Sequence, residues 1–281
     1  MDARMNEAEA NREAILHSPS YVLAEQDLAL LARSELRPVR LQLELLKPEM
    51  AFHEHNISST IVVFGSTRIA ERATLEARLE AARLAAAGGE PRAVRAVAKA
   101  ERLLAKADNY DLAREFGRLV SSRSQSSDSR EYVIVTGGGP GIMEAANRGA
   151  YDVQAESIGL NITLPTEQIP NPYITPDLCF QFHYFALRKL HFLMRAQALV
   201  VFPGGFGTLD EFFETLTLRQ MRRMQEIPVI MVNRKYWEQV VDLQFLADEG
   251  MIEDEHLNLV SYAETADEIW STIVNFHHPQ P

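Results

Sequence analysis

The sequence predicts an α/β fold in which a parallel sheet is covered by helices on both faces. From Thr60 onward, short apolar runs typical of buried strands alternate with longer stretches whose apolar residues have helical spacing. Glycine-rich turns, beginning at Gly65, Gly137 and Pro203, follow three of these apolar runs. Strands and helices that alternate in this way build a Rossmann-like, doubly wound sheet, whose ligands bind beyond the carboxyl ends of the strands.

The chain is expected to divide at about residue 57. Residues 1–57 predict a helical N-terminal extension, because the first sixteen residues are rich in Ala, Glu, Asn and Arg. The leucine pattern between Pro38 and Pro48 does not decide between a helix and a strand. We expect this extension to pack on the core or on a neighbouring subunit, and the alternative is a direct role near the site.

Residues 58–281 carry the predicted sheet domain. Apolar runs predict strands at 60–64, 132–135, 157–162, 178–182, 198–202 and 228–232, with a shorter one at 257–260. Helical spacing predicts helices at 73–87, 111–120, 142–153, 185–195, 208–226, 236–247 and 265–276. A Gly-Gly-Glu-Pro break opens a helical insertion at about 88–107.

The insertion carries a basic stripe. Its cations recur at steps of three and four, which places them on one helix face: Arg92, Arg95, Lys99, Arg102 and Lys106. Such a stripe is usually a solvated face. The alternative is an interface with acidic neighbours.

Composition limits the partners and the compartment. A formal net charge of −11 over 281 residues argues against nucleic acid or an anionic membrane as partner. We find no signal-peptide pattern and no apolar run near the ~20 residues of a membrane span. Cys179 is the only cysteine, so no internal disulfide can form and we expect a reducing, cytoplasmic location. A small phosphorylated ligand remains compatible with this charge.

The central stretch, 200–214, reads VVFPGGFGTLDEFFE and predicts a strand, a glycine loop and a helix. Glycines let the backbone approach a ligand, and the free N–H groups and dipole of a helix N-terminus suit a phosphate. Thr208 can cap the helix or donate to a phosphate oxygen. Asp210 and Glu211 follow in the first turn, where their alternative role is to stabilise the helix dipole.

Two further loops predict contacts with phosphate or ribose. Ser66 and Arg68 follow the first strand, although Ser66 has the alternative role of capping the turn. The second loop reads GGGPG and is followed by Glu144, which either orders the loop or contacts the ligand. This loop has no Lys-Ser or Lys-Thr of a Walker A motif, and Ile142 stands where a dinucleotide motif needs its third glycine.

Three motifs, PGGFGTLDE, GGGPGIMEAA and the Arg188-Lys189 pair in FHYFALRKLHFL, together resemble the LOG family of "lysine decarboxylase-like" phosphoribohydrolases. The resemblance covers roughly Thr60 to Phe276. It implies a nucleotide-binding catalytic domain of the longer-chain type, in a homo-oligomer whose neighbouring subunit completes the site. It also implies hydrolysis of the N-glycosidic bond of a purine nucleoside 5′-monophosphate, AMP or an N6-modified, cytokinin-type AMP, to free base and ribose 5-phosphate.

The resemblance also implies roles for named residues. Glu211 would stabilise positive charge on the ribose and activate water, or attack as a nucleophile. Arg188 would support the leaving base electrostatically, because its pKa is too high for proton donation. Adjacent helical residues point about 100° apart, so Lys189 need not share that role. The expected substrate-binding residues are Gly65, Ser66, Arg68, Gly138, Gly139, Gly141, Glu144, Lys189, Gly204, Gly205, Gly207 and Thr208.

Two other functions compete with this one. The first is a non-catalytic nucleotide or molybdenum-cofactor carrier, against which the presence of both Arg188 and Glu211 argues. The second is lysine decarboxylation, which would need pyridoxal phosphate on a Schiff-base lysine, with Lys189 the nearest candidate. Nothing else in the sequence marks such a site, and no Cys/His/Asp cluster predicts a metal. We therefore expect neither cofactor nor metal.

Overall fold

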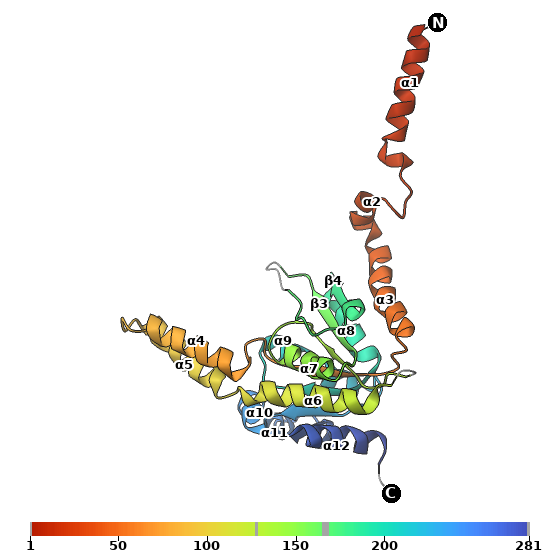
Figure 1. Cartoon of the computed structure of the whole chain (residues 1–281). Helices are drawn as coiled ribbons and strands as arrows, with labels where there is room; N and C mark the ends of the chain where they lie inside the picture. Colours follow the sequence, from red (N-terminus) through yellow and green to blue (C-terminus); the bar gives the residue numbers. More distant parts are fainter. Residues whose placement is uncertain (1, 127–128, 165–168, 280–281) are drawn as a thin grey trace. The chain divides into compact units, whose positions relative to one another are not determined.

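The computed structural model describes residues 2–126, 129–164 and 169–279, and it divides into two units, residues 1–47 and 48–281 (Figure 1). The first unit contains α1 (Asp2–Leu16), α2 (Leu28–Ala32) and the start of α3 (Arg37–Glu54). The stretch that the sequence left open is therefore helical. Pro38 occupies the first turn of α3, where its missing N–H needs no partner. Across the described ranges, no helix combines the length and the apolar character needed to span a membrane.

The described part of the second unit forms a seven-stranded, all-parallel sheet in the order β4-β3-β2-β1-β5-β6-β7. The order changes direction between β1 and β5, which makes this the switch point of the sheet. The strands are β1 (Thr60–Phe64), β2 (Val133–Thr136), β3 (Ser157–Ile162), β4 (Cys179–Phe182), β5 (Ala196–Val201), β6 (Val229–Val232) and β7 (Val260–Ala263).

Helices cover both faces of the sheet, as predicted (Figure 1). One core cluster contains side chains of α6 (Asp108–Ser124), α7 (Ile142–Asp152) and α12 (Ala266–His277). The other contains side chains of α8 (Phe185–Met194), α9 (Phe206–Gln220) and α10 (Arg234–Val240). Within β1, Ile61 and Val63 belong to the first cluster, while Val62 and Phe64 belong to the second. Burial on both faces is the reason why the strands read as unbroken apolar runs.

The expected insertion contains α5 (Pro91–Leu104), which forms a helical hairpin with the preceding helix α4 (Arg72–Ala85). Gly89 turns the chain between them with a φ of 72°, a conformation that glycine adopts without strain. Arg83 pairs with Glu101 across the hairpin at 3.2 Å. Figure 1 shows the hairpin standing out from the helices that cover the sheet.

The helix expected to continue to residue 226 ends at Gln220 instead. Arg222 adopts a left-handed conformation with a φ of 52°, and the N–H of Arg223 donates back to the carbonyl of Leu218 at 2.8 Å. This pattern closes a helix end by satisfying a carbonyl of the last turn. The prediction failed because residues 221–226 are good helix formers, and the stop is set by backbone conformation.

Two predictions near the carboxyl terminus were also wrong. The helix expected at 236–247 is two helices, α10 and α11 (Leu243–Asp248), because Asp242 accepts from the Phe245 N–H at 2.9 Å and starts a new helix. The strand expected at 257–260 lies at Val260–Ala263. Residues 254–259 form a 3₁₀ helix that begins with a capping box between Glu253 and His256.

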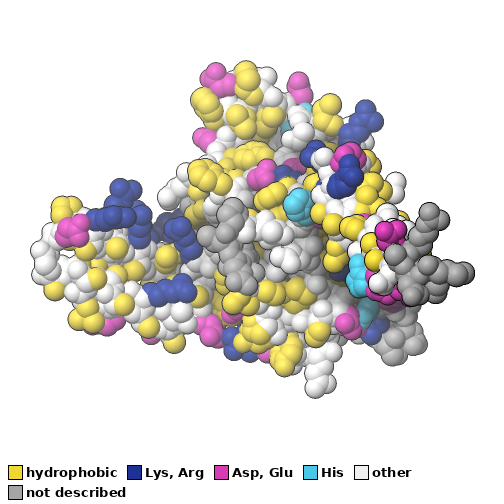
Figure 2. Space-filling model, turned by 90° about the horizontal axis from the view of Figure 1, so that it is seen from above, with side chains coloured by type: hydrophobic (Ala, Val, Ile, Leu, Met, Phe, Trp, Pro, Cys, Tyr) yellow, Lys and Arg dark blue, Asp and Glu magenta, His cyan; other side chains and the backbone are white. Residues whose placement is uncertain are grey.

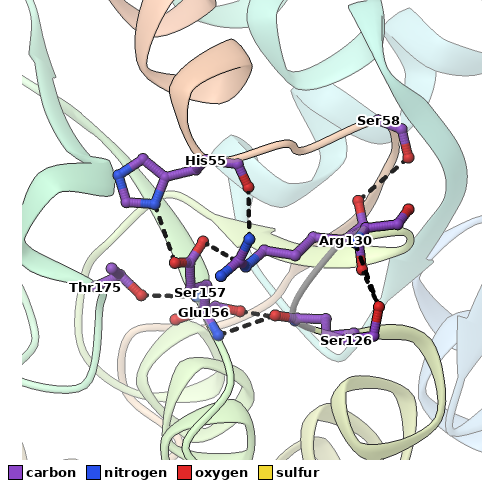
Figure 3. A network of polar contacts seen from close by, with 9 residues as sticks. His55, Ser58, Ser126, Arg130, Glu156, Ser157 and Thr175 are labelled. Carbon is purple, nitrogen blue, oxygen red and sulfur yellow. Dashed lines mark hydrogen bonds and ion pairs between the residues drawn. The ribbon is translucent and has the colours of Figure 1, made fainter.

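A polar network ties together the segments that enter the sheet at its amino edge (Figure 3). The Glu156 carboxylate contacts His55 Nδ1 at 3.0 Å and Arg130 Nε at 3.1 Å. Arg130 also donates to the His55 carbonyl at 2.9 Å, and Ser58 Oγ donates to the Arg130 carbonyl at 3.2 Å. These side chains bond to one another, so we assign this edge a structural role.

Candidate active site

A cavity of about 620 Å³ lies where the loops after β1 and β5 meet, at the switch point of the sheet. Ligands of open parallel sheets bind in this position. The lining comes from the loop after β1, Met143 of α7, the start of α8, the glycine loop with the first two turns of α9, Tyr236 of α10, and the end of the α4–α5 hairpin. Of the expected site residues, it includes Gly65, Ser66, Arg68, Arg188, Gly204, Gly205, Gly207, Thr208 and Glu211.

The glycine loop between β5 and α9 has a packed side and an open side. A Cβ added at Gly204 would lie 2.1 Å from Thr208 Oγ1, so only glycine fits there. The Gly204 carbonyl accepts from the Tyr236 hydroxyl at 2.5 Å, which ties the loop to α10. A Cβ added at Gly205 or Gly207 would meet nothing within 4 Å. These two glycines therefore present backbone to the open cavity.

Glu211 is a buried carboxylate in the wall of this cavity. It lies in the second turn of α9 and is 7% exposed. Burial raises the pKa of Glu211 to about 7, against the opposing charges of Lys189 and Arg188. A carboxylate with a pKa near neutrality can exchange a proton at physiological pH, which is a property of general bases and acids.

Arg188 lies in the same wall, on α8. Its Nε donates to the Leu160 carbonyl at 2.7 Å, and its guanidinium lies 5.0 Å from the centre of the Phe192 ring. Burial lowers the pKa of Arg188, while the charge of Glu211 raises it. A Cβ added at Gly137 would come within 2.7 Å of Arg188 Nη2, so this glycine makes room for the guanidinium.

Lys189 does not line the cavity. Its Nζ contacts Asp210 at 2.8 Å and Glu214 at 3.0 Å, and its side chain is 19% exposed. Neighbouring positions on α8 thus have different roles: Arg188 lines the cavity, and Lys189 lies outside the lining and pairs with two acids of α9. Surface solvation, the ordinary alternative for Lys189, does not describe this side chain.

The GGGPG loop packs against other loops. A Cβ added at Gly138, whose φ is 72°, would lie 1.7 Å from Asn161 Oδ1. Asn171 donates to the carbonyls of Gly138 and Gly139 at 2.9 and 3.1 Å. At Gly141, with a φ of 79°, a Cβ would lie 2.4 Å from the carbonyl oxygen of Ser66. In this structure these three glycines hold the loop beside the β1 loop, outside the cavity lining.

The remaining expected residues divide in the same way. Ser66 and Arg68 line the cavity, and Ser66 Oγ also accepts from the Arg68 N–H at 3.1 Å, so the turn-capping role is present as well. Glu144 lies outside the lining and accepts from the Tyr110 hydroxyl at 2.8 Å, between α7 and α6. Its observed contact therefore orders the helices behind the loop.

Several lining residues were missed by sequence reasoning. Arg102 and Lys106, the last two cations of the insertion's stripe, line the cavity, although the stripe was expected to be solvated. Figure 2 shows Lys and Arg side chains gathered over this hairpin. Phe185 and Phe206 also line the cavity, and Phe206 is 92% exposed. Phe206 could have been found from the sequence, because it is an aromatic residue between two glycines of a predicted ligand loop. Tyr236 also lines the cavity, and nothing in its sequence neighbourhood indicates this.

Comparisons with known proteins agree with the motifs. The family model described as "Possible lysine decarboxylase" matches residues 143–273, a range that contains Arg188, the glycine loop and Glu211. A probable cytokinin riboside 5′-monophosphate phosphoribohydrolase, LOGL3 of Oryza sativa subsp. japonica, is 22% identical over 152 residues, which cover 51% of this chain and 68% of the relative.

Two solved structures are similar to part of this chain. The molybdenum cofactor binding protein of Rippkaea orientalis has 20% identity and a TM-score of 0.44, covering 60% of this chain and 88% of that protein. The X-ray structure of TM1055 has 18% identity and a TM-score of 0.46, covering 76% and 98%. The sequence matches agree with each other: residues 143–273 are similar to the lysine decarboxylase-like family, and the curated relative is a LOG protein.

Proposed function

We propose that this protein is a phosphoribohydrolase that splits a purine nucleoside 5′-monophosphate into free base and ribose 5-phosphate. The observation that carries the proposal is the position of Glu211, a buried carboxylate one helical turn beyond a glycine loop that opens onto the same cavity. Glu211 follows Gly207 by four residues, which is about 6 Å along a helix at ~1.5 Å per residue. A phosphate at the loop would therefore place its ribose beside Glu211.

The loop and the carboxylate have complementary roles. The backbone N–H groups around Gly205 and Gly207, with the hydroxyl of Thr208, would bind the 5′-phosphate at the positive end of α9. Breaking the bond between C1′ and the base nitrogen builds positive charge on the ribose. The ionised Glu211 stabilises that charge and takes a proton from the water whose oxygen bonds to C1′.

The leaving base needs its own support. Its nitrogen takes the electron pair of the broken bond and finally a proton from solvent. The guanidinium of Arg188, held by Leu160 and lying in the same wall, would stabilise that developing negative charge. Among the described lining residues the carboxylates are Asp210 and Glu211, and Asp210 pairs with Lys189. Glu211 is therefore the carboxylate that we assign to the reaction.

Lysine decarboxylation, which the family description suggests, receives little support from this geometry. A Schiff-base lysine must lose its proton and reach the cofactor carbonyl. Lys189, the candidate nearest the motifs, bridges two carboxylates and lies outside the cavity lining. Both carboxylates favour its charged form.

We also propose that the protein acts as a homo-oligomer, as the family resemblance implies. Large apolar side chains are exposed on α8 and α9, namely Phe185, Leu190, Met194 and Phe213. Apolar surface of this kind marks protein interfaces. Light scattering during size-exclusion chromatography tests the proposal, and a monomer at micromolar concentration would contradict it.

Product analysis tests the proposed reaction. The purified protein is incubated with AMP, and with N6-prenylated AMP, and the products are separated by chromatography. We expect adenine or its N6-modified form together with ribose 5-phosphate, and no product from Glu211→Gln. AMP binding without base release would reject the hydrolase and leave a nucleotide carrier.

A further inference from the structure

The α4–α5 hairpin contributes two cations to the cavity. Arg102 lies in the last turn of α5, and Lys106 follows two residues after that helix ends. Both line the cavity. In the part of the chain that the structure describes, neither has a carboxylate within ion-pair distance. Arg83, Arg72 and Arg114, which lie nearby in sequence or on neighbouring helices, all pair with acids.

Lys106 lies on the side of the cavity formed by the glycine loop. Its Nζ is 5.9 Å from the centre of the Tyr236 ring, and the Tyr236 hydroxyl donates to the carbonyl of Gly204. Lys106 Nζ also donates to the Arg102 carbonyl at 3.1 Å, which links the two residues. An ammonium group has three protons, so further donors remain for a ligand.

The phosphate end of the cavity needs such cations. The glycine loop supplies backbone N–H groups but no positive side chain, and the helix that follows carries Asp210 and Glu211. A phosphate with two negative charges beside Glu211 is repelled. Arg188 is tied to the Leu160 carbonyl, and Lys189, which lies outside the lining, is paired with Asp210 and Glu214.

We propose that Arg102 and Lys106 bind the 5′-phosphate of the substrate, so that the α4–α5 hairpin is part of the substrate site and selects phosphorylated over unphosphorylated nucleosides. The identity of the ligand as a nucleotide rests on the function proposed above. The stripe on α5 then has two parts. Arg92 and Arg95 lie near the start of the helix, outside the lining, while Arg102 and Lys106 reach the cavity.

Calorimetric titration of AMP and of adenosine tests this proposal. The protein carries Glu211→Gln to prevent turnover, and the full chain is used. Replacing both Arg102 and Lys106 by Ala is expected to weaken AMP binding by about tenfold or more, because hydrogen bonds to charged groups are lost. Adenosine binding is expected to stay the same, since adenosine lacks the phosphate.

The matched control is the double variant Arg92→Ala and Arg95→Ala, which removes the same charge from the same basic stripe outside the cavity lining. It is expected to bind AMP as the parent does. An equal loss of AMP affinity in both double variants would overturn the proposal in favour of a general charge effect, and so would no loss in the Arg102/Lys106 variant. Unfolding temperatures confirm that both variants fold.

Steady-state kinetics of proteins that retain Glu211 distinguish this proposal from the proposed function. If AMP binds through Arg102 and Lys106 and no base is released, the hydrolase is rejected while the phosphate site stands. If base is released and the KM for AMP is unchanged in the Arg102/Lys106 variant, the hydrolase stands while the phosphate site is overturned. With both correct, KM rises about tenfold and kcat changes little, because the lost contact is made equally in ground and transition states.

Discussion

Replacing Glu211 by Gln should remove activity and stabilise the protein, with a pH dependence that identifies the cause. Glu211 is buried, and burial raises its pKa from 4.5 to about 7. A folded-state pKa above the unfolded-state value means that the folded protein binds the proton more tightly. The resulting stability is fully present below pH 4.5 and is lost as the pH rises through about 7.

The size of the effect follows from the two pKa values. At about 1.36 kcal/mol per unit, the shift costs about 3 kcal/mol of stability when the carboxylate is fully ionised, near pH 8. Glutamine keeps the shape of the neutral acid and carries no charge, so the variant escapes this cost. In a domain of this size, about 3 kcal/mol corresponds to a rise of roughly 6–12 °C in unfolding temperature.

Calorimetry of both proteins between pH 4 and pH 9 measures this difference. The unfolding temperature of Glu211→Gln minus that of the wild type should be near zero at pH 4 and should rise to its plateau above pH 7. Glu76→Gln, which removes the same charge from an exposed position on α4, should show no such rise. A difference that stays constant with pH would refute the reasoning, because Glu211 would then ionise like an exposed carboxylate.

Three further predictions concern the same site. Lys189 is the largest opposing charge on Glu211, so Lys189→Met should raise the pKa of Glu211 and move the midpoint of kcat/KM against pH upward; an unmoved midpoint contradicts this. Gly205→Ala should raise the KM for AMP at unchanged unfolding temperature, whereas Gly141→Ala should cost about 1–3 kcal/mol of stability, since its φ is positive and its loop is packed. Phe206→Ala should raise the KM for AMP about tenfold by removing a stacking surface, while inhibition by ribose 5-phosphate should not change.

Much of the fold was predictable because the strands are buried on both faces. Thr60–Phe64 and Ser157–Ile162 were predicted to the residue, since burial on both faces favours apolar or small residues and only Asn161 departs from this pattern. The edge strand Val260–Ala263 was misplaced, and three of its four residues are only partly buried. Its short sequence carries little periodic signal, and one neighbour, β6, selects the register.

The site was predictable where a motif is local. The loop, Glu211 and Arg188 are marked by their own sequence neighbourhoods and come together in one cavity. Arg102 and Lys106 carried no such mark, because about a hundred residues separate them from the loop that they face. Only the return of the hairpin to α6 brings them there. A helical pattern of charges locates a face of a helix, and tertiary structure decides what that face contacts.

The arrangement of charge around α9 explains why Arg188 and Lys189 stand side by side. Asp210, Glu211 and Glu214 lie on one helix within two turns, and the charges of Glu214 and Asp210 add to the burial that raises the pKa of Glu211. Lys189 neutralises Asp210 and Glu214 from outside the cavity, and Arg188 offsets the charge of Glu211 from within it. Together they bring the pKa of Glu211 down toward neutrality from the higher value that burial alone would give. The remaining requirement is a counter-charge for a phosphate at the start of α9, and in this chain the hairpin cations Arg102 and Lys106 stand on that side of the cavity.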